Sequence, residues 1–112
     1  MGNLTLRFLH EEDLVTSFIV TDTNKVPVDL SAELSLTIKV YEIFSSGLVE
    51  INSQQILESM GGNWSLGDIA INLAFPTLKA NKVYTMRIVT SAGVLVADGT
   101  IQAVTSKSLL QE

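Results

Sequence analysis

Apolar and polar residues alternate strictly along residues 34–41, LSLTIKVY. Because successive side chains of a β-strand point to opposite faces of a sheet, the apolar side chains from Leu34 to Val40 are predicted to share one face. The same period of two recurs in residues 4–8, 69–73 and 84–88, and no helical apolar pattern extends beyond a turn or two. The sequence therefore predicts a fold built from strands that each place one face on a core.

Two further segments have the composition of strands. Residues 14–21, LVTSFIVT, are rich in β-branched and aromatic residues, and their consecutive Phe-Ile-Val predicts a middle strand that is buried on both faces. Residues 94–104 form the other segment, in which Gly99 predicts a β-bulge. Small and polar residues suited to turns end the apolar runs at residues 22–25, 45–47, 61–63 and 91–93.

Short strands joined by short turns are typical of a two-sheet sandwich and not of an α/β fold. The 112 residues fit one domain. We therefore predict an all-β, immunoglobulin-like antiparallel β-sandwich of about seven strands. The domain is expected to span residues 1–105, and residues 106–112 are expected to form a C-terminal tail.

A leucine and a tyrosine mark the start of a late strand, in the segment from Leu78 to Ile88. In immunoglobulin-like sandwiches, a tyrosine at this place packs its ring in the core and bonds its hydroxyl back to the preceding loop, an arrangement called the tyrosine corner. Tyr84 is a candidate for this role. An ordinary core tyrosine at the start of a strand explains the pattern equally well.

The composition of the chain argues against several partners. Its 12 acidic and 7 basic residues give a net charge of −5, which disfavours binding to nucleic acid or to anionic lipid. No apolar run approaches the roughly 20 residues of a membrane helix, and the N-terminus lacks the pattern of a signal peptide. Cysteine is absent, which excludes disulfides and thiolate metal sites. We expect neither nucleic acid nor membrane as a partner.

The charge is unevenly distributed. Residues 1–60 carry three basic and nine acidic residues, whereas residues 61–112 carry four basic and three acidic ones. Opposite patches of this kind can orient one copy of a protein against another. A solvated acidic edge is the simpler explanation of such an imbalance.

One cluster has side chains that could hold a metal: His10, Glu11, Glu12 and Asp13. These residues are consecutive, so their side chains diverge, and a charged turn that keeps a sheet edge soluble explains them better than a cation site. His10 is the only histidine, and no G-x-S-x-G motif accompanies it. We therefore predict that the chain is not an enzyme and that it uses no metal and no cofactor.

Exposed apolar residues are the best candidates for an interface. The only tryptophan follows a turn, where it is either an anchor for a sugar or protein or, as we favour, a core residue that closes one end of the sandwich. Alternation places several valines on outer faces, where they need cover. The candidate interface residues are Val83, Val89, Val94, Val96, Trp64, Glu11, Glu12 and Asp13.

The order of these segments resembles a known family. It runs from NLTLRFL through FIVTDTNKVPVDLSA, LSLTIKVYE and GNWSLGDIAINL to the closing hairpin TMRIVTSAGVLVADGTI. This order is similar to that of the immunoglobulin-like N-terminal domain of phage baseplate upper proteins and related small virion modules. A "G-x-P-x-D-L" segment occurs in that family, and the chain matches its Pro27, Asp29 and Leu30, with Asn24 and Lys25 near the place of the glycine.

The resemblance implies a non-enzymatic building block of a bacteriophage particle, assembled in the bacterial cytoplasm. Its partners would be other copies of itself and other virion proteins. We expect a free-standing tail or baseplate module, with a capsid decoration protein as the alternative. A hypothesis from another class is a small carbohydrate- or ligand-binding sandwich, in which Trp64 and the turns at residues 45–47 and 91–93 would cluster at one end.

Overall fold

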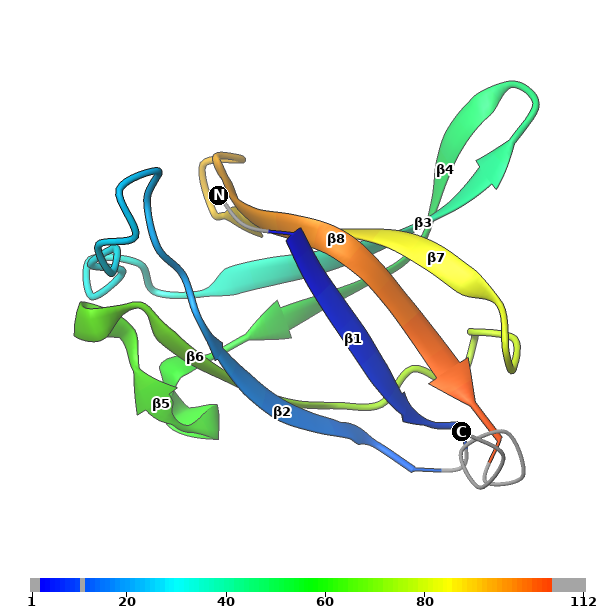
Figure 1. The fold of residues 1–112 in the computed structure, drawn as a ribbon, viewed down its shortest axis with the longest axis horizontal. Coiled ribbons are helices and arrows are strands. Elements are labelled where there is room, and N and C mark those ends of the chain that lie inside the picture. The colour runs from blue at the N-terminus through cyan, green and yellow to red at the C-terminus, as the bar shows by residue number, and fades with distance from the viewer. Residues whose placement is uncertain (1–2, 11, 106–112) are drawn as a thin grey trace.

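The computed structural model describes residues 3–10 and 12–105, which form eight strands and two short 3₁₀ turns (Figure 1). In chain order these are β1 (Asn3–Leu9), β2 (Leu14–Ile19), β3 (Leu36–Phe44), β4 (Gly47–Ile56), η1 (Glu58–Met60), β5 (Gly62–Asn63), η2 (Trp64–Leu66), β6 (Asp68–Leu73), β7 (Val83–Thr90) and β8 (Leu95–Val104). Glu11 and the tail predicted for residues 106–112 lie outside the described residues.

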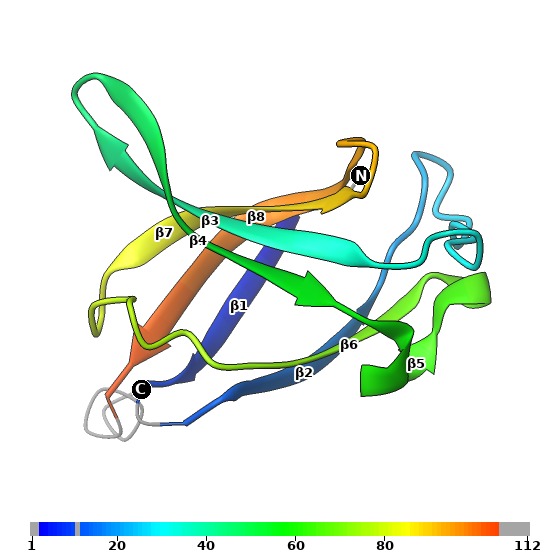
Figure 2. The ribbon, with the colours of Figure 1, turned by 180° about the vertical axis from the view of Figure 1, so that it is seen from behind.

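The strands form two sheets that pack face to face, as Figures 1 and 2 show from opposite sides. The larger sheet has the order β1-β8-β7-β3-β4, and the smaller has the order β2-β6-β5. The predicted all-β sandwich is thereby confirmed, with eight strands. One pairing departs from the antiparallel prediction, because β1 runs parallel to β8. Nearly the whole domain separates these two strands in sequence, so no hairpin fixes their relative direction.

The core lies between the two sheets and is built from the alternating positions of the strands. Leu34 is an exception to the predicted pattern: it is 92% exposed, because it precedes β3 and lies in an irregular segment. The buried side chains contributed by the predicted alternating segments are Leu6, Phe8, Leu36, Ile38, Val40, Ile69, Ile71, Tyr84, Met86 and Ile88.

Strand β2 lies at the edge of its sheet and is not the middle strand that its apolar run predicted. In the described part of the chain, β6 is its neighbour on one side and no strand lies on the other. Val15 is 70% and Ile19 is 60% exposed, whereas Leu14 is buried. The run therefore follows ordinary alternation, and its outward positions happen to be apolar.

The bulge in β8 lies at Val96 and not at Gly99 as predicted. The register of β7 against β8 shifts between Ile88 and Val89, which leaves Val96 as the extra residue. Gly99 is paired in register with strands on both sides. A Cβ atom at Gly99 would overlap the backbone of Leu4 in β1, so this glycine permits β1 to approach β8 closely.

Tyr84 forms the predicted tyrosine corner. Its side chain is 2% exposed, and its hydroxyl accepts a hydrogen bond of 3.0 Å from the backbone N–H of Lys79 in the preceding loop. The ammonium of Lys82 lies 5.5 Å from the centre of the same ring. The corner fixes the loop through which the chain passes from β6 in one sheet to β7 in the other.

We expect Tyr84→Phe to lower the free energy of unfolding by about 1 kcal/mol, because the partly buried N–H of Lys79 loses its acceptor. Urea unfolding followed by circular dichroism measures this change. Tyr41→Phe is the matched control, since it removes a hydroxyl from the outer face of the same sheet and should change stability by less than about 0.5 kcal/mol. Equal losses in the two variants would contradict the corner.

Candidate functional site

The four candidate valines do not form one patch. Val83 is 55% exposed at the start of β7, and Val94 is 61% exposed in the turn after its end, so the length of the strand separates them. Val89 is half-buried. Val96 is buried, because the bulge turns it to the same side as its neighbour Ala97. The prediction that Val96 lies on an outer face is therefore wrong.

Trp64 is a core residue and offers no surface to a partner. It opens the 3₁₀ turn η2, and its side chain is 0% exposed. Gly67 ends this turn in the left-handed conformation, with φ at 70°, and its N–H donates to the carbonyl of Trp64. The inclusion of Trp64 among the interface residues is wrong, and the alternative of a core tryptophan is correct.

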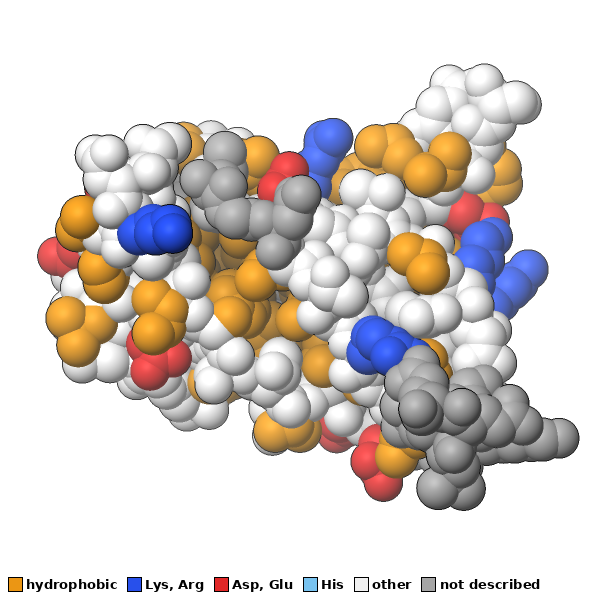
Figure 3. Space-filling view, viewed as in Figure 1, with side chains coloured by type: hydrophobic (Ala, Val, Ile, Leu, Met, Phe, Trp, Pro, Cys, Tyr) orange, Lys and Arg blue, Asp and Glu red, His pale blue; other side chains and the backbone are white. Residues whose placement is uncertain are grey.

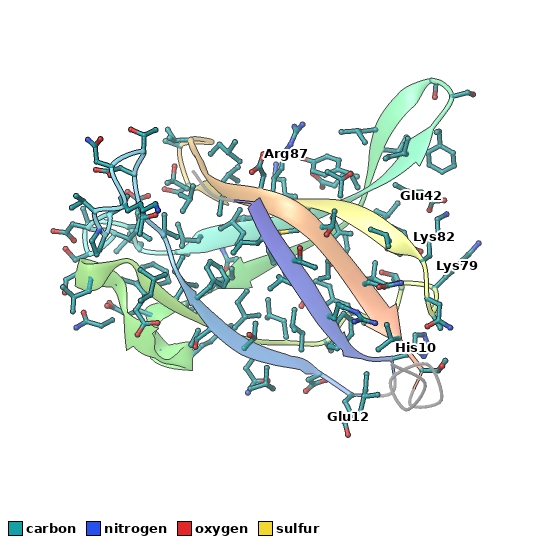
Figure 4. All side chains as sticks on the ribbon, in the orientation of Figure 1. His10, Glu12, Glu42, Lys79, Lys82 and Arg87 are labelled. Carbon is teal, nitrogen blue, oxygen red and sulfur yellow. The ribbon has the colours of Figure 1, made fainter. Side chains whose placement is uncertain are left out.

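The acidic turn between β1 and β2 is solvated. Glu12 and Asp13 are exposed, and Figure 4 shows His10 and Glu12 at the end of the domain where the chain leaves β1. Glu11, which is also among the candidate interface residues predicted from the sequence, lies outside the described residues. Among the residues described, no group of three histidine or acidic side chains is placed to hold a metal ion.

The middle of the outer face of the larger sheet is polar. The guanidinium of Arg87 lies 5.4 Å from the centre of the Tyr41 ring (Figure 4), and Lys39 Nζ lies 3.7 Å from Glu50 Oε1. Such exposed contacts contribute little free energy and keep a surface hydrated. The valines on this face therefore border a charged centre and do not continue into an apolar patch.

A hairpin arm projects from the larger sheet. Strands β3 and β4 remain paired as far as Phe44 and Gly47, whereas β7 pairs with β3 only as far as Tyr41. Residues 42–49 are therefore a two-stranded ribbon without support from a third strand, and Figures 1 and 2 show it standing clear of the domain. We call these residues the β3–β4 arm.

The β3–β4 arm carries four exposed apolar side chains. Ile43 is 70%, Phe44 46%, Leu48 42% and Val49 45% exposed. Ile43 is paired with Leu48, so these two share one face of the ribbon, and Phe44 and Val49 lie on the other. A hairpin with one solvated face would be polar on that face, and this one is apolar on both.

The base of the arm is fixed to the domain. Lys82 Nζ donates to Glu42 Oε2 at 2.5 Å, and this hydrogen bond raises the pKa of Lys82 above its ordinary value against the opposing effect of desolvation. The register of β3 against β4 shifts between Val40 and Tyr41, which leaves Ile51 as a bulged residue. Bulges bend and twist a strand, so the arm leaves the plane of the sheet at this point.

An apolar groove of about 380 Å³ opens at the other end of the domain. It lies between the end of β2 with the turn that follows and the turn between β7 and β8, and Figure 3 shows apolar side chains gathered in a hollow there. Thr21, Thr23 and Thr90 are among its polar residues. Its apolar lining consists of Val20, Val28, Leu30, Val94, Leu95 and Val96.

The first wall of the apolar groove is formed by the segment that carries the family resemblance. Asp22 Oδ1 accepts hydrogen bonds from the N–H groups of Asn24 and Val26, which closes a tight turn. The chain then runs back along the end of β2, where the N–H of Val28 donates to the carbonyl of Val20 at 3.0 Å. The N–H of Leu30 donates to the carbonyl of Trp64, so the wall is anchored to the core.

The arm and the groove lie at opposite ends of the sandwich. Because β3 and β7 are antiparallel, the turn after β3 is at one end and the turn after β7 is at the other. The turns at residues 45–47 and 91–93 therefore do not meet. With Trp64 buried as well, the cluster predicted for a carbohydrate-binding module is absent from the described residues.

Sequence reasoning missed the arm, and of the groove it identified only Val94 and Val96, as outward-facing valines. The arm had one signal: the apolar pairs Ile43-Phe44 and Leu48-Val49 flank the turn at residues 45–47. A hairpin of a sheet that faces water on one side does not need apolar pairs on both sides of its turn. The groove depends on contacts between residues 20–30 and 90–96, which no local pattern indicates.

Comparison of the chain with known protein families, with curated proteins and with solved structures finds no match. In the described part of the chain, no helix is long and apolar enough to span a membrane.

Proposed function

We propose that this protein is a non-enzymatic structural subunit of a bacteriophage virion, and specifically a tail or baseplate module that acts through protein–protein contacts. The observation that carries the assembly role is the β3–β4 arm with its four exposed apolar side chains. The resemblance to the immunoglobulin-like domain of phage baseplate upper proteins supplies the virion setting, with assembly in the cytoplasm of the bacterial host.

The chemistry of the arm supports an assembly role. Contiguous exposed apolar side chains on a soluble domain mark surfaces that are covered by a partner. The centres of protein interfaces are poor in charge and rich in aromatic and aliphatic residues, and the tip of the arm has that composition. In a virion many copies of one subunit meet each other and their neighbours, so such a surface is covered in the assembled particle.

A capsid decoration protein would use the same surface. The arm favours assembly over a solitary domain but does not select the tail over the head. The family resemblance favours the tail or baseplate. The location of the chain on the particle separates the two proposals.

A small-molecule binding module is a second candidate, because the apolar groove has a volume in the range of ligand sites, about 300–1,000 Å³. The groove is lined mainly by aliphatic side chains and contains no aromatic residue. Sugar sites use aromatic platforms, so the groove suits an apolar ligand and not a carbohydrate.

The test is to look for the chain in particles. Phage particles purified on a density gradient from a host that carries the gene would be digested for peptide mass spectrometry and labelled with immunogold against the purified protein. We expect the peptides to sediment with the particles and the gold to lie at the tail end. Gold on the head would favour the decoration protein. Peptides found only in the soluble fraction would overturn the virion role.

A further inference from the structure

We infer that the β3–β4 arm of one copy of this chain inserts into the apolar groove of a second copy. The inference rests on the proposed role in assembly and adds the identity of the partner and the contact. It joins two apolar features of the described domain that have no cover within the domain, a projection and a recess.

The arm needs a partner for two reasons. A two-stranded ribbon without a third strand or a packed face has little stability of its own in water. Its four apolar side chains lie on both faces of the ribbon, so no rotation of the hairpin against its own domain would cover them all. Cover for the tip must therefore come from another molecule, and the groove of a second copy offers an aliphatic recess for it.

The groove is suited to an apolar hairpin tip. Its side walls are aliphatic, with Val20 and Leu30 on one side and Val94 and Leu95 on the other. Its polar residues are three threonines and Asp22, whose Oδ1 accepts hydrogen bonds from the N–H groups of Asn24 and Val26. Apolar side chains that enter such a groove displace water, and the hydrogen bonds to the Asp22 carboxylate remain in place.

Charge complementarity favours a second copy of this chain as the occupant. Residues 20–33, which include one wall of the groove, carry three acidic residues and one lysine. Residues 74–82, the loop beside the base of the arm, carry two lysines and no acidic residue. Figure 4 places Lys79 and Lys82 next to Glu42 at the base of the arm, and Glu12 at the far side of the same end. Lys82 is paired with Glu42 in the arm, so attraction between Lys79 and the acidic wall would orient the arm toward the groove.

The placement of the two features requires the contact to form between copies. An arm at one end cannot reach the groove at the other end of its own domain, whose longest dimension is 39 Å. Each copy therefore offers its arm and its groove to other copies, either both to one neighbour related by a two-fold axis or each to a different neighbour. The second, head-to-tail arrangement generates a ring if the rotation between copies closes and a filament if it does not.

Sedimentation velocity of the purified chain over a wide concentration range tests the contact. We expect the mean mass to rise with concentration. The arm variant Ile43→Ser/Phe44→Ser and the groove variant Val94→Glu should each weaken self-association roughly tenfold or more, as for central interface residues. All three substituted side chains are exposed, so circular dichroism and the thermal midpoint should be unchanged. Val15→Ser, at a side chain that is 70% exposed on β2, is the matched control and should assemble like the unmodified chain.

Mixing the two defective variants gives the sharper result. The arm variant keeps an intact groove, and the groove variant keeps an intact arm, so one contact remains possible between them. We expect a one-to-one heterodimer and no larger species. An interface in which the arm of one copy meets the arm of another would instead leave the groove variant self-associating like the unmodified chain.

The inference is overturned by any of three results. The unmodified chain stays monomeric at every concentration, the arm variant assembles as the unmodified chain does, or the mixture of variants forms no heterodimer. A monomer whose groove binds an apolar fluorescent dye would assign the groove to a small ligand. None of these results affects the particle test, so a chain found in virions without self-association would leave the proposed function standing and remove only this contact.

Discussion

Gly99→Ala is expected to lower the free energy of unfolding by roughly 3 kcal/mol, at the upper end of ordinary single substitutions. A Cβ atom at this position would overlap the carbonyl and amide of Leu4, and the φ angle of 156° is one that alanine rarely adopts. The overlap is with backbone, so no change of side-chain rotamer relieves it. Strand β1 pairs with β8 alone in the described structure, and it is therefore the element that must move.

Gly93→Ala is the matched control for this prediction. Its φ angle of 84° is also positive, but nothing lies within 4 Å of the added Cβ. The control should cost only the strain of the backbone conformation, about 1 kcal/mol. Urea unfolding measures both losses, and hydrogen exchange shows whether the amides shared by β1 and β8 lose protection in Gly99→Ala alone. Equal losses with unchanged exchange would mean that Gly99 does not set the spacing of the two strands.

The role of Gly99 illustrates what the sequence alone could not predict. A glycine in a strand indicates either a bulge or a close approach of another backbone, and only the partner strand decides between them. That partner is β1, at the other end of the chain, and its parallel pairing leaves no local pattern. The bulge lies three residues earlier, at Val96. The sequence prediction also assumed unbroken alternation at Val96 and therefore assigned this residue to an outer face. The bulge interrupts the alternation there, and Val96 is buried.

The correct predictions depend either on the local alternation of apolar and polar residues or on a single contact between residues close in sequence. Alternation identified the core faces of β1, β3, β6 and β7 because each strand buries one face against the other sheet. Tyr84 was identifiable because its hydroxyl partner, the N–H of Lys79, is only five residues away.

Strand β4 shows where the same method fails. Its sequence GLVEINSQQI has no continuous alternation, because the extra residue at Ile51 breaks the period. Its first half belongs to the β3–β4 arm, where neither face meets the core, so burial does not select the residues there. Periodicity therefore could not detect β4, which carries two of the four exposed apolar side chains of the arm, Leu48 and Val49.

Trp64→Ala is expected to have the largest effect on stability, a loss of about 4 kcal/mol in the free energy of unfolding. The indole is 0% exposed and is the largest fully buried side chain of the described core. Its removal leaves a cavity that rigid neighbours fill only partly. The carbonyl of Trp64 would still accept hydrogen bonds from the N–H groups of Leu30 and Gly67. The loss of stability therefore measures the contribution of the indole side chain and not that of the turn's backbone hydrogen bonds.

Trp64→Phe separates packing from hydrogen bonding at this site. The indole Nε1 has no hydrogen-bond partner among the residues described. Trp64→Phe therefore removes a buried N–H group whose desolvation is not compensated by a hydrogen bond. This gain in stability offsets part of the stability that is lost because the smaller ring fills less of the core. We expect the free energy of unfolding to fall by only about 1–2 kcal/mol. Urea unfolding followed by circular dichroism compares the two variants with the unmodified chain. A loss in Trp64→Phe as large as that in Trp64→Ala would mean that the N–H is satisfied and that the indole is held by a polar contact. Losses below about 1 kcal/mol in both would show that the side chain does not fill the core, and would return Trp64 to the surface where an interface could use it.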